Sequence, residues 1–112
     1  MTMNPILLCA LAAGALLGTG AHAADAAAAK ALASKSACMA CHAVDKKLVG
    51  PAFKDVAAKH KGQADALEKV AARIKSGGSG LYGPVPMPPQ ANLKDDELKL
   101  LAGWVLAGAP DQ

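Results

Sequence analysis

The clearest helical pattern in the chain lies in residues 65–75. Apolar side chains recur there at intervals of three and four residues, which is typical of the buried face of a helix. These side chains are Leu67, Val70, Ala71 and Ile74. Gly77 and Gly78 follow and are expected to end the helix, because glycine readily adopts the left-handed conformation found just beyond a helix C-terminus. The pattern predicts a helix with one face turned to the core.

A second apolar stripe lies near the C-terminus and predicts a last helix after Asn92. The stripe consists of Leu98, Leu101 and Val105, with Trp104 beside it. Asn92 is a good N-cap residue, and the acidic residues 95–97 suit the positive end of the helix dipole. Gly108 and Pro110 are expected to end the helix.

Two further helices are predicted from composition and from glycine. Residues 25–41 are rich in Ala, Lys and Leu, which are good helix formers, and predict a first helix that ends near the two cysteines. Residues 54–61 predict a short polar helix that Gly62 stops. Between these two helices, residues 43–53 are expected to form a loop that contains the pair Gly-Pro at 50–51.

Residues 77–91 predict a long loop, because they contain four glycines and four prolines. Such a segment cannot form a helix or a central strand. A loop of this length in a small domain is usually functional or disordered. Its apolar members, which argue against disorder, are Leu81, Tyr82, Val85 and Met87. The chain as a whole therefore predicts an all-α fold of three or four helices.

The first 23 residues contain no Asp, Glu, Lys or Arg. Their apolar run, residues 6–17, is shorter than the roughly 20 apolar residues that cross a membrane and has the length of a signal-peptide core. Residues 21–23, Ala-His-Ala, match a cleavage site. We therefore expect a cleaved secretory signal over residues 1–23, which includes Cys9, and one domain over residues 24–112. Because no Lys or Arg precedes the apolar run, an uncleaved amphiphilic anchor stays open.

The composition of residues 24–112 narrows the classes of function. They carry all twelve basic and all nine acidic side chains, so their net charge is +3. This charge is only mildly basic, and the clustered Lys and Arg residues expected of a nucleic-acid binder are not present in the sequence. Their only aromatic residues are Phe53, Tyr82 and Trp104, and much of the apolar content is Ala, which buries little area. A large flat cofactor at the centre would supply what so small a core lacks.

Two residues separate Cys38 from Cys41, and His42 follows at once. A thioredoxin-type pair needs neighbouring strands, which are not predicted, and a zinc site needs a fourth ligand, for which only His60 remains. A disulfide can form in an exported protein, but it gives the histidine no role. Cys-x-x-Cys-His is the attachment motif of c-type haem. Two thiols one turn apart can reach the two vinyl groups on one porphyrin edge, and the next imidazole can reach the iron.

An electron-transfer haem needs a second axial ligand, and Met87 is the candidate. It lies in the sequence PVPMPP, whose prolines restrict the loop 77–91. Met39 is excluded because it lies between the attachment cysteines, and the methionines before residue 24 leave with the signal. The alternative role for Met87 is to fill a gap in the core.

His60 is the rival sixth ligand. It lies in the short helix predicted for residues 54–61, beside Lys59 and Lys61. Because this helix is rich in lysine, we expect His60 to be a solvated surface residue.

Four stretches of the chain, taken in order, resemble the small bacterial class I cytochromes c, most closely the cytochrome c-551 type. They are CMACHAVDKKLVGPAFKDVAAKHKGQ, RIKSG, LYGPVPMPPQ and DDELKLLAGWVL. The resemblance covers nearly all of residues 24–112. It implies the class I cytochrome c fold, in which three to four short helices wrap around one covalently attached haem. In this family His42 and Met87 would be the axial iron ligands, and Cys38 and Cys41 would form the thioethers.

The resemblance also implies roles for residues around the haem. The Pro51 carbonyl would accept a hydrogen bond from His42 Nδ1 and hold the imidazole. Arg73 and Trp104 match positions that hydrogen-bond the haem propionates or pack beside them. Tyr82 replaces a Trp that is frequent in close relatives, so a hydroxyl would make the propionate hydrogen bond there. The other departures from the family pattern are Gln90, His60 at an aromatic position, and a segment before the last helix that is one residue longer.

We therefore expect a soluble periplasmic carrier of single electrons and not an enzyme, because two filled axial positions leave none for a substrate. The resemblance suggests a quinol-oxidising respiratory complex as donor. It suggests the periplasmic haem nitrite reductase of denitrifying bacteria, a cytochrome c peroxidase or a terminal oxidase as acceptor. The rivals are a haem sensor with an open sixth position and a cytochrome module of an enzyme complex.

Redox partners are expected to dock at the haem edge of a monomer. The apolar candidates for this surface are Met39, Ala40, Leu48, Val49, Pro86 and Pro88. The basic candidates around them are Lys46, Lys47 and Lys54. A small apolar contact with a charged rim suits fast and weak encounters. We expect no nucleic-acid partner and, after processing, no membrane span.

Overall fold

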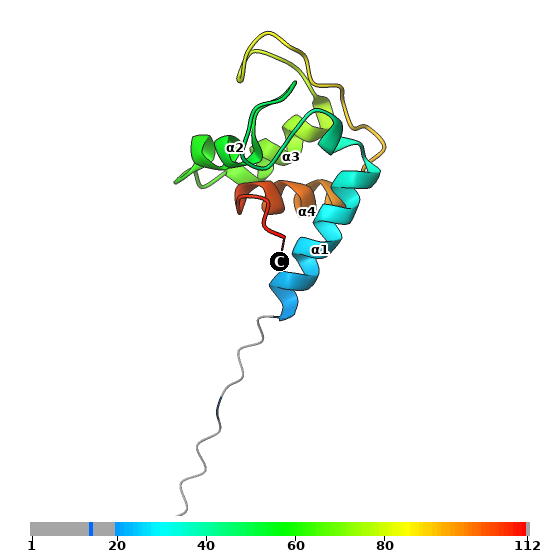
Figure 1. Cartoon of the computed structure of the whole chain (residues 1–112), viewed down its shortest axis with the longest axis vertical. Helices are drawn as coiled ribbons and strands as arrows, with labels where there is room; N and C mark the ends of the chain where they lie inside the picture. The colour runs from blue at the N-terminus through cyan, green and yellow to red at the C-terminus, as the bar shows by residue number, and fades with distance from the viewer. Residues whose placement is uncertain (1–13, 15–19, 112) are drawn as a thin grey trace, which may run out of the picture.

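The computed structural model describes Gly14 and residues 20–111, and it consists of helices joined by loops. In chain order the helices are α1 (Gly20–Lys35), the short 3₁₀ turn η1 (Cys38–Ala40), α2 (Phe53–His60), α3 (Ala66–Ser76) and α4 (Asp95–Leu106) (Figure 1). The described residues form no β-strand, and one isolated β-bridge joins Gly78 to Met87. The predicted all-α architecture is confirmed.

Helix α4 forms the centre of the fold, since α1, α2 and α3 all pack against it (Figure 1). Its buried residues are Leu98, Leu101, Ala102, Trp104 and Val105. They include the whole predicted stripe and the tryptophan beside it. The helical spacing of these residues therefore explains how α4 can contact three neighbours at once.

Helix α3 agrees with its prediction to within one residue at each end. Val70 and Ala71 are buried in the core, while Leu67 and Ile74 are partly buried and pack against it. The helix ends at Gly77, which has a positive φ of 62° and whose N–H donates to the Arg73 carbonyl at 2.8 Å.

Helix α1 turns a row of alanines towards the core. Ala26, Ala29 and Ala33 recur at helical spacing, and the last two have no exposed surface. Because methyl side chains are small, the backbone of α1 can approach α4 closely, and these two helices are in contact. Alanine here contributes close packing more than buried area.

The end of the first helix differs from its prediction. We expected one helix over residues 25–41, but α1 ends at Lys35, Cys38 begins the separate turn η1, and Cys41 directly follows that turn. Ala37 between them adopts a left-handed conformation, with φ of 59°. This residue redirects the chain, and nothing in the composition of an alanine-rich segment indicates it.

The start of α4 also differs from its prediction. The residue that precedes the helix is Lys94, not Asn92. The Lys94 backbone N–H donates to Glu97 Oε1 at 3.0 Å, so a carboxylate inside the first turn reaches back to the helix start. Asn92 lies in the preceding turn, where the Leu93 N–H donates to the Gln90 carbonyl at 3.3 Å.

Most of the predicted signal segment, including Cys9, lies outside the described residues. Residues 20–23, which contain the predicted cleavage site, form the first turn of α1. Cleavage after Ala23 therefore stays a prediction. In the described part of the chain, no helix combines the length and apolar character needed to cross a membrane.

Residues 77–91 fold into a defined loop. The Gly78 N–H donates to the Met87 carbonyl, the Met87 N–H donates to the Gly78 carbonyl, and both distances are 2.9 Å. Gly77 is required beside this bridge, because a Cβ atom built there would collide with the Met87 carbonyl oxygen. The loop closes on itself near its base, where the bridge restrains the backbone of Met87. A defined loop agrees with the apolar residues within it, which argued against disorder.

Candidate functional site

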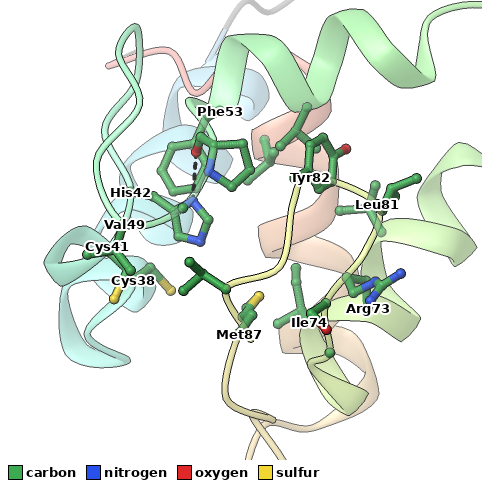
Figure 2. Close-up of a pocket in the computed structure, with 18 of the residues that line it drawn as sticks. Cys38, Cys41, His42, Val49, Phe53, Arg73, Ile74, Leu81, Tyr82 and Met87 are labelled. Carbon is green, nitrogen blue, oxygen red and sulfur yellow. Dashed lines mark hydrogen bonds between the residues drawn. The ribbon is translucent and has the colours of Figure 1, made fainter.

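A cavity of about 340 Å³ lies between α2, α3, α4, the turn η1 and the loop 77–91 (Figure 2). Every residue that the sequence assigned to the site lines this cavity. They are Cys38, Cys41, His42, Pro51, Arg73, Tyr82, Met87 and Trp104. Apolar side chains from three helices complete the wall, among them Val56, Val70 and Leu101. The fold therefore gathers residues from most of its length around one space.

The turn η1 places the two cysteines and the histidine side by side. The Cys38 carbonyl accepts from the N–H of Cys41 at 3.2 Å and from the N–H of His42 at 3.0 Å. Both cysteines are free thiols, so the disulfide alternative finds no support. Burial raises the pKa of the Cys38 thiol above its usual value, although a backbone hydrogen bond acts in the opposite direction.

Three neighbours fix the His42 ring. Its Nδ1 lies 2.8 Å from the Pro51 carbonyl oxygen (Figure 2), and a carbonyl can only accept, so Nδ1 carries the proton. The ring stacks on Phe53, with centroids 5.1 Å apart and planes at 19°. Gly50 covers the ring closely, since a Cβ atom there would lie 2.5 Å from His42 Cε1. The lone pair of Nε2 is consequently free to bind a metal.

Met87 approaches the cavity from the loop on the other side. Figure 2 shows its sulfur directed into the cavity, across from the His42 ring. An imidazole nitrogen and a thioether sulfur thus face the same space from two elements that lie far apart in the sequence. This arrangement can supply two ligands to one metal centre.

Tyr82 and Arg73 lie on the side of the cavity away from the cysteines (Figure 2). The Tyr82 hydroxyl is buried and has no hydrogen-bond partner among the described residues. Burial raises the pKa of Tyr82, and the positive charge of Arg73 opposes this shift more weakly. A buried hydroxyl without a partner costs stability. A ligand with oxygen acceptors would satisfy it, and the nearby guanidinium would add a charge-assisted bond.

The Arg73 side chain lies close to the loop 77–91. A Cβ atom at Gly78 would lie 2.7 Å from an Arg73 guanidinium nitrogen, and the Gly78 φ of 122° itself favours glycine. The half-buried Arg73 side chain thus lies next to the loop, at the cavity wall.

Trp104 lines the cavity through its ring alone. Its indole N–H donates to the Pro110 carbonyl at 2.8 Å, so its single donor is used outside the cavity. The ring meets Phe53 edge to face, with centroids 5.4 Å apart. Of the two roles that the resemblance implied for Trp104, this geometry is compatible with packing beside a ligand.

The prediction of a solvated surface position for His60 is wrong. Only 8% of the residue is exposed, and its ring lines the cavity. His60 shares the buried face of α2 with Phe53 and Val56, and this spacing of three and four residues is a signal that the lysines around it obscured. The side chain pairs with Gln63, with 3.1 Å between Nδ1 and Oε1.

The zinc alternative also finds no support. Within the described residues, no group of three or more His, Cys, Asp or Glu side chains is gathered closely enough to hold a metal ion. The His42 imidazole and the Met87 thioether, which face each other across the cavity, fit instead a metal that arrives with its own equatorial ligands, as in haem.

A family model for cytochrome c matches residues 26–108. The chain belongs to the cytochrome c family. Cytochrome c-551 of Pseudomonas aeruginosa is 54% identical to it over 101 residues, which cover 90% of this chain and 93% of the relative. Cytochrome c-552 of Nitrosomonas europaea is 47% identical over 104 residues, which cover 93% of this chain and 97% of the relative.

Solved structures agree with this assignment. The crystal structure of wild-type Nitrosomonas europaea cytochrome c552 matches with a TM-score of 0.68 at 48% identity, over 70% of this chain and 98% of that chain. A class 1 cytochrome from Sideroxydans lithotrophicus matches with a TM-score of 0.62 at 31% identity, over 78% of this chain and 97% of that chain. The cytochrome thus has the class I fold, and its cofactor is a covalently bound haem c.

Proposed function

We propose that this small cytochrome c is a periplasmic carrier of single electrons whose haem is attached at Cys38 and Cys41 and ligated by His42 and Met87. The observation that carries this assignment is the opposition of the His42 ring and the Met87 sulfur across one cavity, next to two free thiols. The bound haem supplies an iron that exchanges one electron between Fe(II) and Fe(III).

The two thiols are the attachment points. Cys38 and Cys41 lie at one end of the cavity (Figure 2), where a porphyrin edge with its two vinyl groups would meet them. Each thiol would add across one vinyl double bond, so that sulfur binds one carbon and the thiol hydrogen goes to the other. Tyr82 and Arg73, on the side of the cavity away from the cysteines, would then be available to bind the propionates.

His42 and Met87 differ in what they contribute to the iron. The Pro51 carbonyl holds the His42 N–H and makes the imidazole a stronger donor. The Met87 thioether is neutral and soft, so it favours Fe(II) and raises the reduction potential. The apolar wall of the cavity also raises the potential, because surroundings of low dielectric disfavour the additional positive charge of Fe(III).

Tyr82 and Arg73 are proposed to bind the haem propionates. The Tyr82 hydroxyl is a buried donor that has no partner in the described part of the chain, and Arg73 lines the same cavity. A carboxylate would accept from both groups. The unsatisfied hydroxyl is therefore an internal indication that an anionic oxygen ligand belongs there.

Filled axial positions distinguish a carrier from a haem sensor. With His42 and Met87 bound, the iron has no position for a diatomic ligand or a substrate. We expect the reduced wild-type protein not to bind carbon monoxide at neutral pH and Met87→Ala to bind it readily, as followed in the absorption spectrum. Rapid binding by the wild type would support the sensor instead.

Export to the periplasm is proposed from the first 23 residues, which lack charged side chains and contain a short apolar run. Mass spectrometry of the haem protein from the periplasmic fraction should give a chain that begins at Ala24. Recovery of the intact chain in the membrane fraction would favour the uncleaved anchor.

Partners are proposed to dock on an apolar patch beside the cavity. Its exposed members include Met39, Leu48 and Val49, of which 40%, 44% and 55% of the surface is exposed. Leu81 and Val85, also exposed and at the cavity wall, join the patch although we did not assign them from the sequence. Pro86, Pro88, Lys46 and Lys47 are exposed as well.

This surface suits a quinol-oxidising complex as donor, and a nitrite reductase, a peroxidase or a terminal oxidase as acceptor, provided that each presents an acidic rim. Lys47→Glu should slow electron transfer to such a partner and weaken its dependence on salt. Equal rates for the variant and the wild type over a salt series would show that Lys47 only keeps the surface soluble.

A further inference from the structure

The tip of the loop 77–91 has few directional ties to the rest of the molecule. In the described chain, the backbone hydrogen bonds of residues 78–87 stay within the segment. They join Gly78 to Met87 and the Gly80 N–H to the Gly83 carbonyl. The next tie lies at the base of the loop, where the Gln90 N–H donates to the Ile74 carbonyl at 3.1 Å. The part that contains Tyr82 therefore depends on side chains for its placement over the cavity.

Lys59 provides such a side chain from α2. Its Nζ lies 5.4 Å from the centroid of the Tyr82 ring, within the distance at which a cation is attracted to an aromatic face. The helix that carries Lys59 is itself fixed, because Phe53, Val56 and His60 are buried on its inner face. Figure 2 shows the Tyr82 ring beside this helix, on the side of the cavity away from the cysteines.

We infer that Lys59 is a positioning residue that clamps Tyr82, and with it the loop that carries Met87, against α2. Tyr82 and Met87 belong to the same loop, whose base is closed by the Gly78–Met87 bridge. If the tip moves away from α2, the Lys59–Tyr82 contact is lost and Met87 has more freedom to leave the iron. The contact therefore favours the closed loop. This inference rests on the proposed ligation by Met87.

The clamp predicts a measurable effect on an external ligand. Imidazole can bind the ferric iron only when Met87 has left, so its apparent affinity is proportional to the fraction of molecules with an open loop. A cation–aromatic contact at the surface corresponds to a change of about two- to fivefold in such an equilibrium. Lys59→Gln should raise the imidazole affinity of the ferric holoprotein by this factor.

Two variants control for the charge of Lys59. Lys61→Gln removes the same charge two residues away and should leave the affinity near that of the wild type. Lys59→Arg keeps a cation that can lie over the ring and should restore the wild-type value.

The decisive comparison is made in the background of Tyr82→Leu, which has no ring. If Lys59 acts through Tyr82, Lys59→Gln adds nothing there, whereas a direct effect of its charge on the haem persists. An unchanged imidazole affinity in Lys59→Gln, or an equal rise in both backgrounds, overturns the clamp. If Tyr82→Leu does not assemble, the clamp is supported when Lys59→Gln raises the imidazole affinity while Lys59→Arg and Lys61→Gln keep the wild-type affinity. Any other pattern contradicts the clamp.

Failure of the clamp and failure of the proposed ligation are distinguishable. Met87→Ala should raise the imidazole affinity far more than any substitution of Lys59. If it does so while Lys59→Gln has no effect, only the clamp is wrong. If Met87→Ala itself leaves the affinity unchanged, Met87 is not the ligand and the proposed function fails with it.

Discussion

The orientation of the His42 ring is fixed by residues that lie close to it in the sequence. The Pro51 carbonyl binds Nδ1, Phe53 stacks on the ring, and Gly50 leaves room for it. Gly50 and Pro51 lie in the connection between η1 and α2, and Phe53 is the first residue of α2. The motif and its support are therefore one local unit. The motif could be recognised from the sequence and the Pro51 contact followed from the family resemblance, whereas the contacts of Phe53 and Gly50 with His42 were not predicted.

Gly50→Ala tests the closest of these contacts. The added Cβ would lie 2.5 Å from His42 Cε1, so the ring or the loop must move. We expect the holoprotein to lose about 1–3 kcal/mol of unfolding free energy, as for other overpacked sites. The measurement is chemical denaturation followed by circular dichroism.

Gly103→Ala in α4 is the matched control for this substitution. There a Cβ has only Leu67 nearby, at 3.8 Å, and a helix interior favours alanine by about 0.5–1 kcal/mol. The control should be neutral or stabilised. Equal stability of the two variants would contradict the close contact with His42.

The single tyrosine of the chain gives a prediction about pH. Burial raises the pKa of Tyr82 above the value of about 10 that is usual for tyrosine, so in the folded protein the neutral phenol is favoured. The unfolded chain releases this proton at lower pH than the folded protein. The unfolding free energy should therefore be unaffected by Tyr82 at neutral pH and fall as the pH rises above about 10.

The phenolate absorbance reports this titration directly, because no other tyrosine contributes. Tyr82→Phe should flatten the alkaline fall in stability relative to the wild type. An identical alkaline profile for both proteins would show that the hydroxyl is not held in its neutral form.

Helices whose apolar residues recur at helical spacing, or that end at a glycine, were predicted well. Helix boundaries that depend on a single residue in an unusual conformation were not. The face of α3 and the stripe of α4 follow from spacing. The break after Lys35 depends on Ala37 in a left-handed conformation, which alanine rarely adopts. The pattern of apolar and polar residues does not predict it. The cap of α4 came from Glu97 and not from Asn92, because a carboxylate in the first turn reached the same backbone group.

The residues of α2 show a second reason why the sequence did not predict every contact. His60 has the spacing of a buried residue relative to Val56, but the lysines beside it suggested a solvated helix. The contact between Lys59 and Tyr82 joins α2 to a loop more than twenty positions away, and no local pattern predicts it. The motifs proposed to supply the iron ligands could be recognised from the sequence because they are local, whereas the contact between Lys59 and the loop could not.

The alanine face of α1 yields a prediction at the level of the element. Ala29 has no exposed surface, so a larger side chain forces α1 away from α4. Ala29→Leu should cost about 1–3 kcal/mol in unfolding free energy. Ala28→Leu, at an exposed position on the same helix, should change it by less than about 0.5 kcal/mol. Thermal unfolding of the two variants measures the difference, and similar melting temperatures would contradict close packing of the alanines.

For the molecule as a whole, the cavity takes the place that large side chains occupy in other small domains. It is lined by residues of α2, α3 and α4 together with both long loops. The buried core around it is made largely of Ala, Val and Leu, with Phe53 and Trp104 as its buried aromatics among the described residues. The helices are short and marginal by themselves. Haem therefore acts as part of the core.

The protein without haem should consequently be largely unfolded. The test is circular dichroism and thermal denaturation of a preparation made without haem attachment. A cooperative transition with near-native helix content would contradict it. Cys38→Ala and Cys41→Ala should both sharply reduce the yield of mature protein, since each removes one attachment point.

The identity of the sixth ligand is the central claim, and a redox titration of wild type, Met87→His and Met87→Ala tests it most directly. A thioether favours Fe(II), whereas an imidazole is a stronger donor to Fe(III). Met87→His should therefore stay six-coordinate and low-spin, with a potential lowered by a substantial part of the roughly 0.8 V that axial ligands span. Met87→Ala should lose the sulfur-to-iron charge-transfer band. If Met87→Ala keeps that band and the wild-type potential, another residue binds the iron and the assignment of Met87 is wrong.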